Sequence, residues 1–223
     1  MKTPNYKIER ESLANGYSFV AGIDEVGRGC LAGPVVAAVV ALNPPSISSG
    51  PKQWHGEVRD SKLLSADKRF ILEPVIKQHS LGWGIGIVSP EFIDELNIHH
   101  ASLLAMAKAV ESFRKTLERF DTHGTRQKLH LLIDGRFTVP NIHNSWLDIE
   151  QTPIIDGDAR VLSISAASIL AKTFRDRLMV KLHRKFPKYE FAQHKGYATR
   201  LHRLAIQKHG LTPIHRVSFC ANI

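Results

Sequence analysis

Three apolar stretches of this chain are each followed by acidic side chains. The acids are Asp24 and Glu25 after residues 17–23, Asp134 after residues 129–133, and Asp156 and Asp158 after residues 152–155. Short apolar runs of this kind predict buried strands, so the acids stand at strand ends. If these ends meet at one edge of a sheet, the carboxylates repel one another, which raises their pKa values unless cations neutralise them. Hard divalent cations with oxygen ligands, such as Mg²⁺, meet this need.

Such a cluster predicts metal-dependent chemistry on a phosphodiester. Two divalent ions about 3.5–4 Å apart can hold a phosphodiester for in-line attack by water. Any one of these aspartates alone is more simply explained as a turn residue, because Asp often begins turns. The repetition of the pattern in a basic protein favours the metal site. The sequence offers neither a Cys/His ligand set nor a Gly-Lys-Ser/Thr phosphate loop, which disfavours zinc chemistry and nucleotide-driven phosphoryl transfer.

A Gly-Arg-Gly tripeptide closely follows the first acidic pair. Gly27 and Gly29 allow positive φ and a close approach to a ligand, and their N–H groups can form an anion nest beside Arg28. Neighbouring residues of a strand point to opposite faces, so Asp24 and Glu25 share a metal only if the strand has already turned. We expect that turn at the two glycines.

The net charge of +9 is concentrated in the C-terminal part of the chain. Residues 172–216 hold 12 Lys and Arg against only Asp176 and Glu190, whereas the remainder is close to neutral. A basic helix surface is often no more than a solvated face. This basic block also contains several aromatic residues, which favours a surface that binds nucleic acid. We expect Asp176 to pair with a neighbouring Arg or Lys, and we assign no role to the histidines of this region, namely His194, His202, His209 and His215.

The pattern of apolar residues predicts an α/β fold with a mixed five-stranded sheet flanked by helices. The predicted strands are residues 17–23, 35–42, 81–88, 129–134 and 152–158. The predicted helices are residues 64–78 with Ser65 as N-cap, a helix start at 89–91 followed by a longer helix from about Asn97, and residues 163–186. Residues 43–59 and 136–151 are predicted loops. The first three strands suit an antiparallel meander, the later ones need helical crossovers, and the glycines of 81–88 leave one face open to close packing.

The organisation predicted from these elements is a domain over residues 1–186 with a basic helical extension over 187–223. No signal segment is apparent, and the longest apolar stretch, residues 31–42, is shorter than the roughly 20 residues that span a bilayer. Two cysteines, Cys30 and Cys220, indicate no disulfide framework. We therefore expect a soluble, cytoplasmic, monomeric protein that does not contact membranes.

Residues 22–34 closely resemble the first signature of the type 2 ribonucleases H, the ribonuclease HII family. The resemblance continues in residues 60–62, 133–135, 157–158, 164–176, 194–199 and 215–219. It implies a ribonuclease H fold and an endonuclease that cleaves the RNA strand of RNA–DNA hybrids. It also implies cleavage 5′ to ribonucleotides embedded in duplex DNA, with two Mg²⁺ or Mn²⁺ ions, leaving 3′-OH and 5′-phosphate ends during ribonucleotide excision repair.

The resemblance also assigns roles to residues. It implies that the metal-binding and catalytic acids are Asp24, Glu25, Asp134 and Asp158. It implies that the substrate contacts are Gly27, Arg28 and Gly29 on the 2′-hydroxyl, Tyr197 stacked on the following deoxyribose, and Ser168 and Lys172 on phosphate. Family members usually carry Lys where this chain has Asp156, which leaves open whether Asp156 contributes. Two alternatives remain: another ribonuclease H-fold nuclease, such as a junction resolvase or an exonuclease, and a non-catalytic nucleic-acid-binding module.

Overall fold

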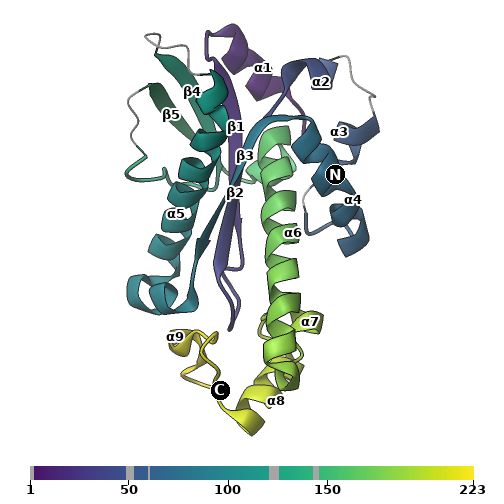
Figure 1. The fold of residues 1–223 in the computed structure, drawn as a ribbon, viewed down its shortest axis with the longest axis vertical. Coiled ribbons are helices and arrows are strands. Elements are labelled where there is room, and N and C mark those ends of the chain that lie inside the picture. The colour runs from purple at the N-terminus through teal and green to yellow at the C-terminus, as the bar shows by residue number, and fades with distance from the viewer. Residues whose placement is uncertain (1–2, 49–52, 60, 121–125, 143–145) are drawn as a thin grey trace.

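The computed structural model describes residues 3–48, 53–59, 61–120, 126–142 and 146–223, which contain a five-stranded sheet with helices on both faces (Figure 1). The strands are β1 (Phe19–Val26), β2 (Val35–Leu42), β3 (Ser80–Val88), β4 (Gln127–Asp134) and β5 (Leu147–Ile154). The α-helices are α1 (Lys7–Ala14), α2 (Pro44–Ser48), α3 (Gln53–Glu57), α4 (Ala66–Gln78), α5 (Pro90–Leu117), α6 (Leu162–Lys185), α7 (Phe191–His194), α8 (Arg200–His209) and α9 (Val217–Cys220). Short 3-10 helices are η1 (Glu118–Phe120), η2 (Gly157–Ala159) and η3 (Pro187–Tyr189). Within these described ranges, every helix is too short or too polar to cross a membrane.

The sheet has the strand order β3-β2-β1-β4-β5. β1 pairs antiparallel with β2, and β2 pairs antiparallel with β3, whereas β4 is parallel to both β1 and β5. The chain passes from β3 to β4 through α5, as a crossover between strands requires. The predicted mixed sheet is confirmed.

Helix α5 lies close against β3 because that strand presents glycines to it. A Cβ atom added to Gly86 would lie 1.9 Å from the carbonyl oxygen of Ala105, and one on Gly84 would lie 2.3 Å from the N atom of Phe113. The apolar core on this side of the sheet includes Ile23 and Phe113, and Phe113 is one of the largest fully buried side chains. The predicted close packing on the bare face of β3 is therefore confirmed.

Helix α6 covers the opposite face of the sheet, beside β1 and β2 (Figure 1). A Cβ atom on Gly22 would lie 2.2 Å from the backbone N of Ile164, so only glycine permits this approach. The buried Glu9 of α1 accepts a hydrogen bond from the N–H of Ser163 at 2.8 Å, which places a carboxylate at the N-terminus of α6. The start of α6 is thus fixed against both β1 and α1.

The predicted helix boundaries agree with the structure at several points. Ser65 precedes α4, and its hydroxyl oxygen accepts a hydrogen bond from the N–H of Lys68 at 3.2 Å. Within α5, Asn97 has a φ of 66°, and the two helices expected there meet at this residue. Helix α6 ends two residues before Pro187.

Two stretches differ from the prediction. Residues 43–59 were expected to be a loop, but their described part contains α2 and α3, because Trp54 is buried there and stacks on His79 with 4.9 Å between ring centroids. The fifth strand spans Leu147–Ile154 rather than residues 152–158, so residues 147–151 of the loop predicted over 136–151 are strand instead. β5 is an edge strand with partly exposed polar residues, so its first half lacks the apolar signal of a buried strand.

The C-terminal helices form a separate apolar cluster at the far end of α6 (Figure 1). The cluster joins residues of the loop after β1, of α6 and of the C-terminal segment: Leu31, Ala32, Met179, Tyr189, Phe191, Ala205, Ile206 and Cys220. The helical character of this segment is as predicted, while the domain division at residue 186 stays a prediction.

Replacing Gly86 with alanine tests the close packing of α5 on β3. Gly86→Ala should destabilise the protein by about 1–3 kcal/mol, because a methyl group cannot fit against the Ala105 carbonyl without moving α5. Gly56→Ala is the matched control, since a Cβ there meets nothing within 4 Å. Urea denaturation of both variants measures the effect; equal stability would contradict the packing described.

Candidate active site

Asp24 is the most buried of the candidate acids and lies on β1, with 5 % of its surface exposed. Its Oδ1 atom accepts a hydrogen bond from the N–H of Glu25 at 2.7 Å, and the Ser168 side chain of α6 forms another. Burial raises the pKa of Asp24 well above its usual range. The charges of Glu25, Asp134 and Asp158 raise it further, whereas the Ser168 hydrogen bond lowers it. Carboxylates from separate segments therefore meet around Asp24, as predicted.

Asp134 is the last residue of β4, the parallel neighbour of β1. Its Oδ1 atom accepts hydrogen bonds from the N–H groups of Gly157 at 2.8 Å and Asp158 at 3.3 Å. Burial, with the charge of Asp158, raises the pKa of Asp134 to about 6. Asp158 is itself 7 % exposed and lies 3.4 Å from the Nζ atom of Lys62. The turn after β5 thus brings Asp158 to the same end of the sheet.

Asp156 lies outside this group. It is exposed, has a left-handed backbone with a φ of 54°, and lines a different cavity of about 770 Å³ together with Arg59, Lys68 and Arg160. Its charge is not among the causes that raise the pKa of the buried acids. The geometry favours Asp158 over Asp156 as the fourth acid.

Glu25 follows Asp24 without a turn, so the condition for the two acids to face the same side is not met; the turn comes after Val26 at Gly27, one of the two glycines where we expected it. β1 remains paired with β2 through Val26, because this pairing with a neighbouring strand outweighs the local glycines. Alternation along the strand turns Glu25 towards the α5 side, where its Oε1 atom lies 3.0 Å from Nη1 of Arg28. The acidic cluster therefore spans both faces of the sheet at the end of β1.

Two fully buried arginines, Arg175 and Arg216, hold the loop after β1 in place from the protein interior. Arg216 donates hydrogen bonds to the carbonyl oxygens of Gly27 at 2.7 Å and Arg28 at 2.8 Å. Because N–H and C=O point in opposite directions across a trans peptide, the N–H groups of Arg28 and Gly29 point away from Arg216. No hydrogen-bond partner for these two N–H groups is found among the described residues. They are oriented to bind a ligand.

The two glycines of this loop behave differently. Gly27 has a φ of 96°, and a Cβ atom there would lie 2.3 Å from Nε of Arg175. Gly29 does not have positive φ, contrary to expectation, and a Cβ atom on it would meet nothing within 4 Å. Gly27 therefore makes the turn, while Gly29 leaves open space in front of the loop.

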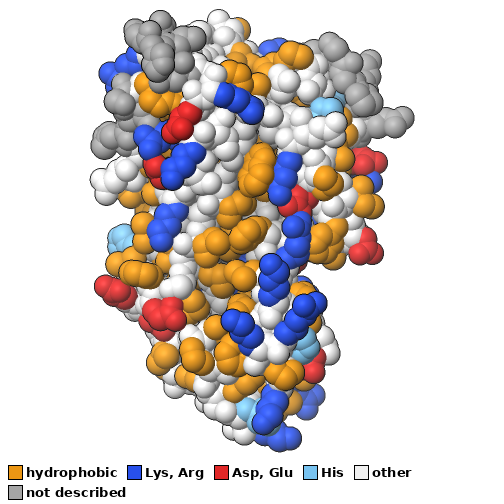
Figure 2. Space-filling view, in the orientation of Figure 1, with side chains coloured by type: hydrophobic (Ala, Val, Ile, Leu, Met, Phe, Trp, Pro, Cys, Tyr) orange, Lys and Arg blue, Asp and Glu red, His pale blue; other side chains and the backbone are white. Residues whose placement is uncertain are grey.

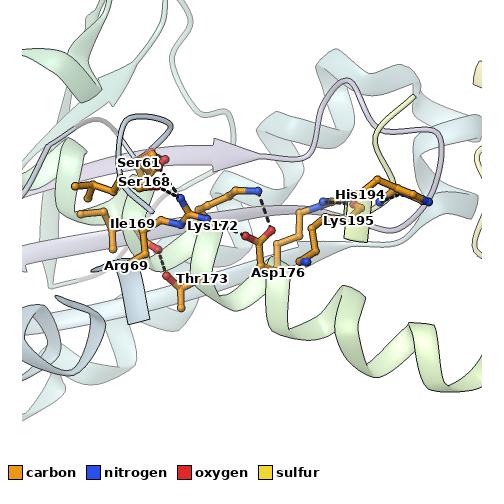
Figure 3. A network of polar contacts seen from close by, with 12 residues as sticks. Ser61, Arg69, Ser168, Ile169, Lys172, Thr173, Asp176, His194 and Lys195 are labelled. Carbon is orange, nitrogen blue, oxygen red and sulfur yellow. Dashed lines mark hydrogen bonds and ion pairs between the residues drawn. The ribbon is translucent and has the colours of Figure 1, made fainter. Parts of the chain in front are cut away.

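A polar network runs along one face of α6 (Figure 3). The Oγ atoms of Ser168 and Ser61 are 2.9 Å apart, and Lys172 Nζ lies 2.8 Å from Asp176 Oδ1. Arg69 donates to Asp176 at 3.2 Å and to the carbonyl oxygen of Ser61 at 2.9 Å. The predicted ion pair of Asp176 is confirmed. The phosphate contacts expected of Ser168 and Lys172 stay predictions.

Tyr197 lies beside the Gly-Arg-Gly loop. Its backbone forms an isolated antiparallel bridge with Cys30, next to Gly29, and its side chain is 38 % exposed. The ring centroid lies 5.3 Å from Nζ of Lys172. An exposed aromatic ring next to the free N–H groups of the loop is suited to stacking on a sugar or base.

A cavity of about 210 Å³ adjoins the acids on the α5 side and includes Glu25, Asp134, Arg28, Arg136 and Phe137 in its wall. Phe137 is 57 % exposed, with its ring 4.6 Å from that of His99. The loop is fixed two residues later, where Val139 exchanges backbone hydrogen bonds of 2.7 and 3.1 Å with the Gln151 side chain. Sequence reasoning missed Arg136 and Phe137, although their position directly after Asp134-Gly135 was a signal.

Basic side chains gather along α6 and over the C-terminal helices (Figure 2). The exposed members of the basic block are Arg177, Lys181, Arg184, Lys185, Lys188, Arg200, Arg203 and Lys208. Arg175 and Arg216 belong to the same block in the sequence but are buried beneath the loop. The exposed residues form a face suited to a polyanion.

The candidate acids form a donor set that fits divalent cations. Within the described parts of the chain, no three His, Cys, Asp or Glu side chains are arranged to hold a metal ion as they stand. Instead Glu25 pairs with Arg28 and Asp158 with Lys62, cations whose side chains are 48 % and 78 % exposed. In both pairs the carboxylate is largely buried, with 11 % and 10 % of its side chain exposed, and the cation reaches it from the solvent side. Burial raises the pKa values of Asp24 and Asp134, and the neighbouring acids raise them further; a divalent cation at this place would favour the charged carboxylates.

Comparison with known proteins gives one consistent family. Residues 21–222 match the family model described as Ribonuclease HII. A protein named Ribonuclease HII from Clostridioides difficile is 46% identical over 216 residues, covering 97% of this chain and 75% of that protein. One of the same name from Bacteroides fragilis is 48% identical over 200 residues, covering 89% and 88%. The crystal structure of the ribonuclease H2 from Pyrococcus horikoshii shares the fold, with a TM-score of 0.66, 23% identity and coverage of 91% and 95%.

Asp134→Asn tests the burial of this carboxyl beside the other acids. The folded carboxyl keeps its proton up to about pH 6 rather than 3.8, so in metal-free buffer the wild type loses stability as the pH rises through this window. The amide oxygen of Asn can still accept both backbone hydrogen bonds. The variant should therefore melt higher than the wild type at pH 7, and the difference should vanish near pH 4. Thermal unfolding in a chelator measures it, with the exposed Asp156→Asn as control; a pH-independent difference would argue that the acids lie apart.

Proposed function

The chain belongs to the ribonuclease HII family of metal-dependent hydrolases that cleave RNA in RNA–DNA hybrids, and we propose that it also cuts 5′ to single ribonucleotides in duplex DNA. Cleavage leaves a 3′-OH and a 5′-phosphate and uses two divalent ions. The observation that carries this proposal is the convergence of four carboxylates beside a loop whose N–H groups face outward. We also propose that the protein is a monomer. It would act in the cytoplasm, in ribonucleotide excision repair.

The four acids would hold two Mg²⁺ or Mn²⁺ ions when substrate is bound. Bound divalent ions activate a water molecule and stabilise the developing charge on the phosphate. The chain prepares the ligands for this task before the ions bind. Ser168 hydrogen-bonds to Asp24, and the backbone N–H groups of Gly157 and Asp158 orient Asp134. A carboxylate held by fixed donors keeps its orientation as the charge around it changes.

Recognition of the ribonucleotide falls to the loop and to Tyr197. The 2′-hydroxyl is the group that distinguishes RNA from DNA at a given position, and it can accept hydrogen bonds from the outward N–H groups of Arg28 and Gly29. Tyr197, fixed beside Cys30, would stack on the sugar of the next deoxynucleotide. Lys172, whose ammonium group lies near the Tyr197 ring, would contact the adjoining phosphate, with Ser168 at the inner end of the same helix face.

Phe137 would contact the substrate from the α5 side. Its exposed ring and the Arg136 guanidinium share a cavity with two of the acids, so a nucleotide next to the scissile phosphate can stack on the ring. The basic face along α6 and α8 would bind the backbone of the duplex farther from the cut.

Cleavage of defined duplexes tests the proposed function. With Mg²⁺, a DNA duplex carrying one ribonucleotide should be cut on its 5′ side, whereas the all-DNA control should stay intact. Asp24→Asn and Glu25→Gln should lower kcat by about 100-fold or more, because each removes a charged ligand, while affinity for the duplex changes little. Gel analysis of end-labelled strands and fluorescence anisotropy measure the two effects. Cleavage of both duplexes, or of neither, would refute the proposal.

Phe137→Ala tests the contact on the α5 side. Loss of one base–aromatic stack costs about 1–3 kcal/mol, so KM for the ribonucleotide duplex should rise several-fold or more while kcat stays within about twofold. Phe92→Ala removes another exposed phenylalanine, 47 % exposed on α5, and serves as control. If both variants gave the same KM, Phe137 would have no role in binding.

A further inference from the structure

Three buried histidines surround the backbone of Tyr197, although the function proposed above uses none of them. His194, His202 and His215 are 8 %, 0 % and 3 % exposed. The rings of His194 and His202 stack with 4.4 Å between centroids. Nε2 of His202 lies 3.0 Å from Nε2 of His215, so these two rings share a hydrogen bond.

The hydrogen bonds around the pair fix the direction of donation. Nδ1 of His215 accepts from the N–H of Thr212 at 2.9 Å and lies 2.8 Å from the hydroxyl of the same residue, which can donate to it as well, so in a neutral ring the proton of His215 is on Nε2. That proton is donated to Nε2 of His202, which leaves the His202 proton on Nδ1. His202 Nδ1 then donates to the carbonyl oxygen of Tyr197 at 3.0 Å. One chain of donors thus runs from Thr212 to Tyr197.

His194 supports the preceding residues in the same way. Its Nδ1 atom accepts from the N–H of Gly196 at 3.2 Å, and its Nε2 atom therefore donates to the carbonyl oxygen of Tyr189 at 2.7 Å. The bonded backbone is strained at Lys195, a non-glycine residue with a φ of 52°. Left-handed backbone at a non-glycine residue costs about 1 kcal/mol or more and persists only where neighbouring contacts hold it.

The same unit is tied to the Gly-Arg-Gly loop. His215 forms an isolated bridge with Ala32, and the next residue, Arg216, donates to the carbonyl oxygens of Gly27 and Arg28. The backbone beside Tyr197 also meets this loop directly, where the N–H of Leu31 donates to the carbonyl oxygen of Gly196 at 2.8 Å. His215 orients His202, and His202 adds a side-chain hydrogen bond to the Tyr197 carbonyl at this contact.

We propose that His194, His202 and His215 form one neutral hydrogen-bonded unit that positions Tyr197 against the Gly-Arg-Gly loop and so sets selectivity for the RNA–DNA junction. The proposal rests on the proposed function for the role of Tyr197. The three histidines are positioning residues that do not touch the substrate. A second proton on any of them would face another N–H group, so the unit is intact only when all three rings are neutral. Burial lowers the pKa values of His202 and His215 to about 4, in agreement with neutral rings at pH 7.

The tautomers can be measured without substrate. Long-range ¹H–¹⁵N NMR spectra of the full chain at pH 7 distinguish protonated from bare ring nitrogens. We expect the proton on Nδ1 in His202 and on Nε2 in His194 and His215. A proton on Nε2 of His202, or a charged ring at any of the three positions, would overturn the proposal even if the enzyme were fully active.

Two substitutions of His202 separate positioning from simple packing. The Asn amide can place an N–H group where Nδ1–H stands, whereas the longer Gln reaches the Nε2 position. His202→Asn should therefore keep kcat/KM on the single-ribonucleotide duplex within about threefold of wild type, and His202→Gln should lower it by about tenfold. His209→Asn, on the same helix but outside the unit, is the control. Equal losses in the Asn and Gln variants would reduce His202 to a packing residue and overturn the proposal.

The Tyr197 ring gives a readout that does not depend on cleavage. Its NMR signals should shift in His202→Gln and remain near the wild-type positions in His202→Asn. If the wild type fails to cut the ribonucleotide duplex while these signals behave as expected, the proposed function fails and the positioning role stands. If the wild type cuts normally and the Tyr197 signals ignore both substitutions, the positioning role fails alone.

Discussion

Mutual repulsion among buried carboxylates is the constraint on which the rest of this structure depends. Asp24 is withdrawn from water and surrounded by the charges of three other acids, which is unfavourable in a folded chain without a compensating cation. The structure limits the cost with fixed dipoles: the Ser168 side chain contacts Asp24, and two backbone N–H groups contact Asp134. Arg28, an exposed cation, pairs with the outer rim of the cluster. The divalent ions proposed above would neutralise the remaining negative charge.

Close packing on both sides of the sheet makes this arrangement possible. Helix α6 can bring Ser168 to Asp24 only because Gly22 leaves no Cβ between β1 and the start of the helix. On the other face, the glycines of β3 let α5 approach until its backbone touches the strand. The site is therefore built on strands and long helices, whose positions are set by backbone contact. Rigid elements hold charged groups in place more accurately than loops do, which matters where like charges must stay close.

Local sequence patterns predicted the buried strands and the meeting of the acids, because buried strands carry a continuous apolar signal. Asp134 was placed correctly as the last residue of its strand. The end of β1 at Val26 could not be read locally, since it depends on pairing with β2. The first half of the edge strand β5 was missed because its partly exposed polar residues lack the apolar signal of a buried strand. Arg175 and Arg216 were counted with a basic surface, but they bind backbone carbonyls inside the protein, and composition cannot distinguish these two uses of arginine.

β1 continues without a turn through Asp24 and Glu25, so the two acids lie on opposite faces of the sheet. Asp24 faces α6 and Glu25 faces α5, so the acidic end of the sheet is open to contacts from both helical layers. On the α6 side stand Tyr197 and its histidine support; on the α5 side stands Phe137 on a fixed loop. A nucleic acid strand that crosses the end of β1 would meet an exposed aromatic ring in each layer. Had the strand turned before Glu25, both acids would face one layer, and the other would have no charged group to contribute.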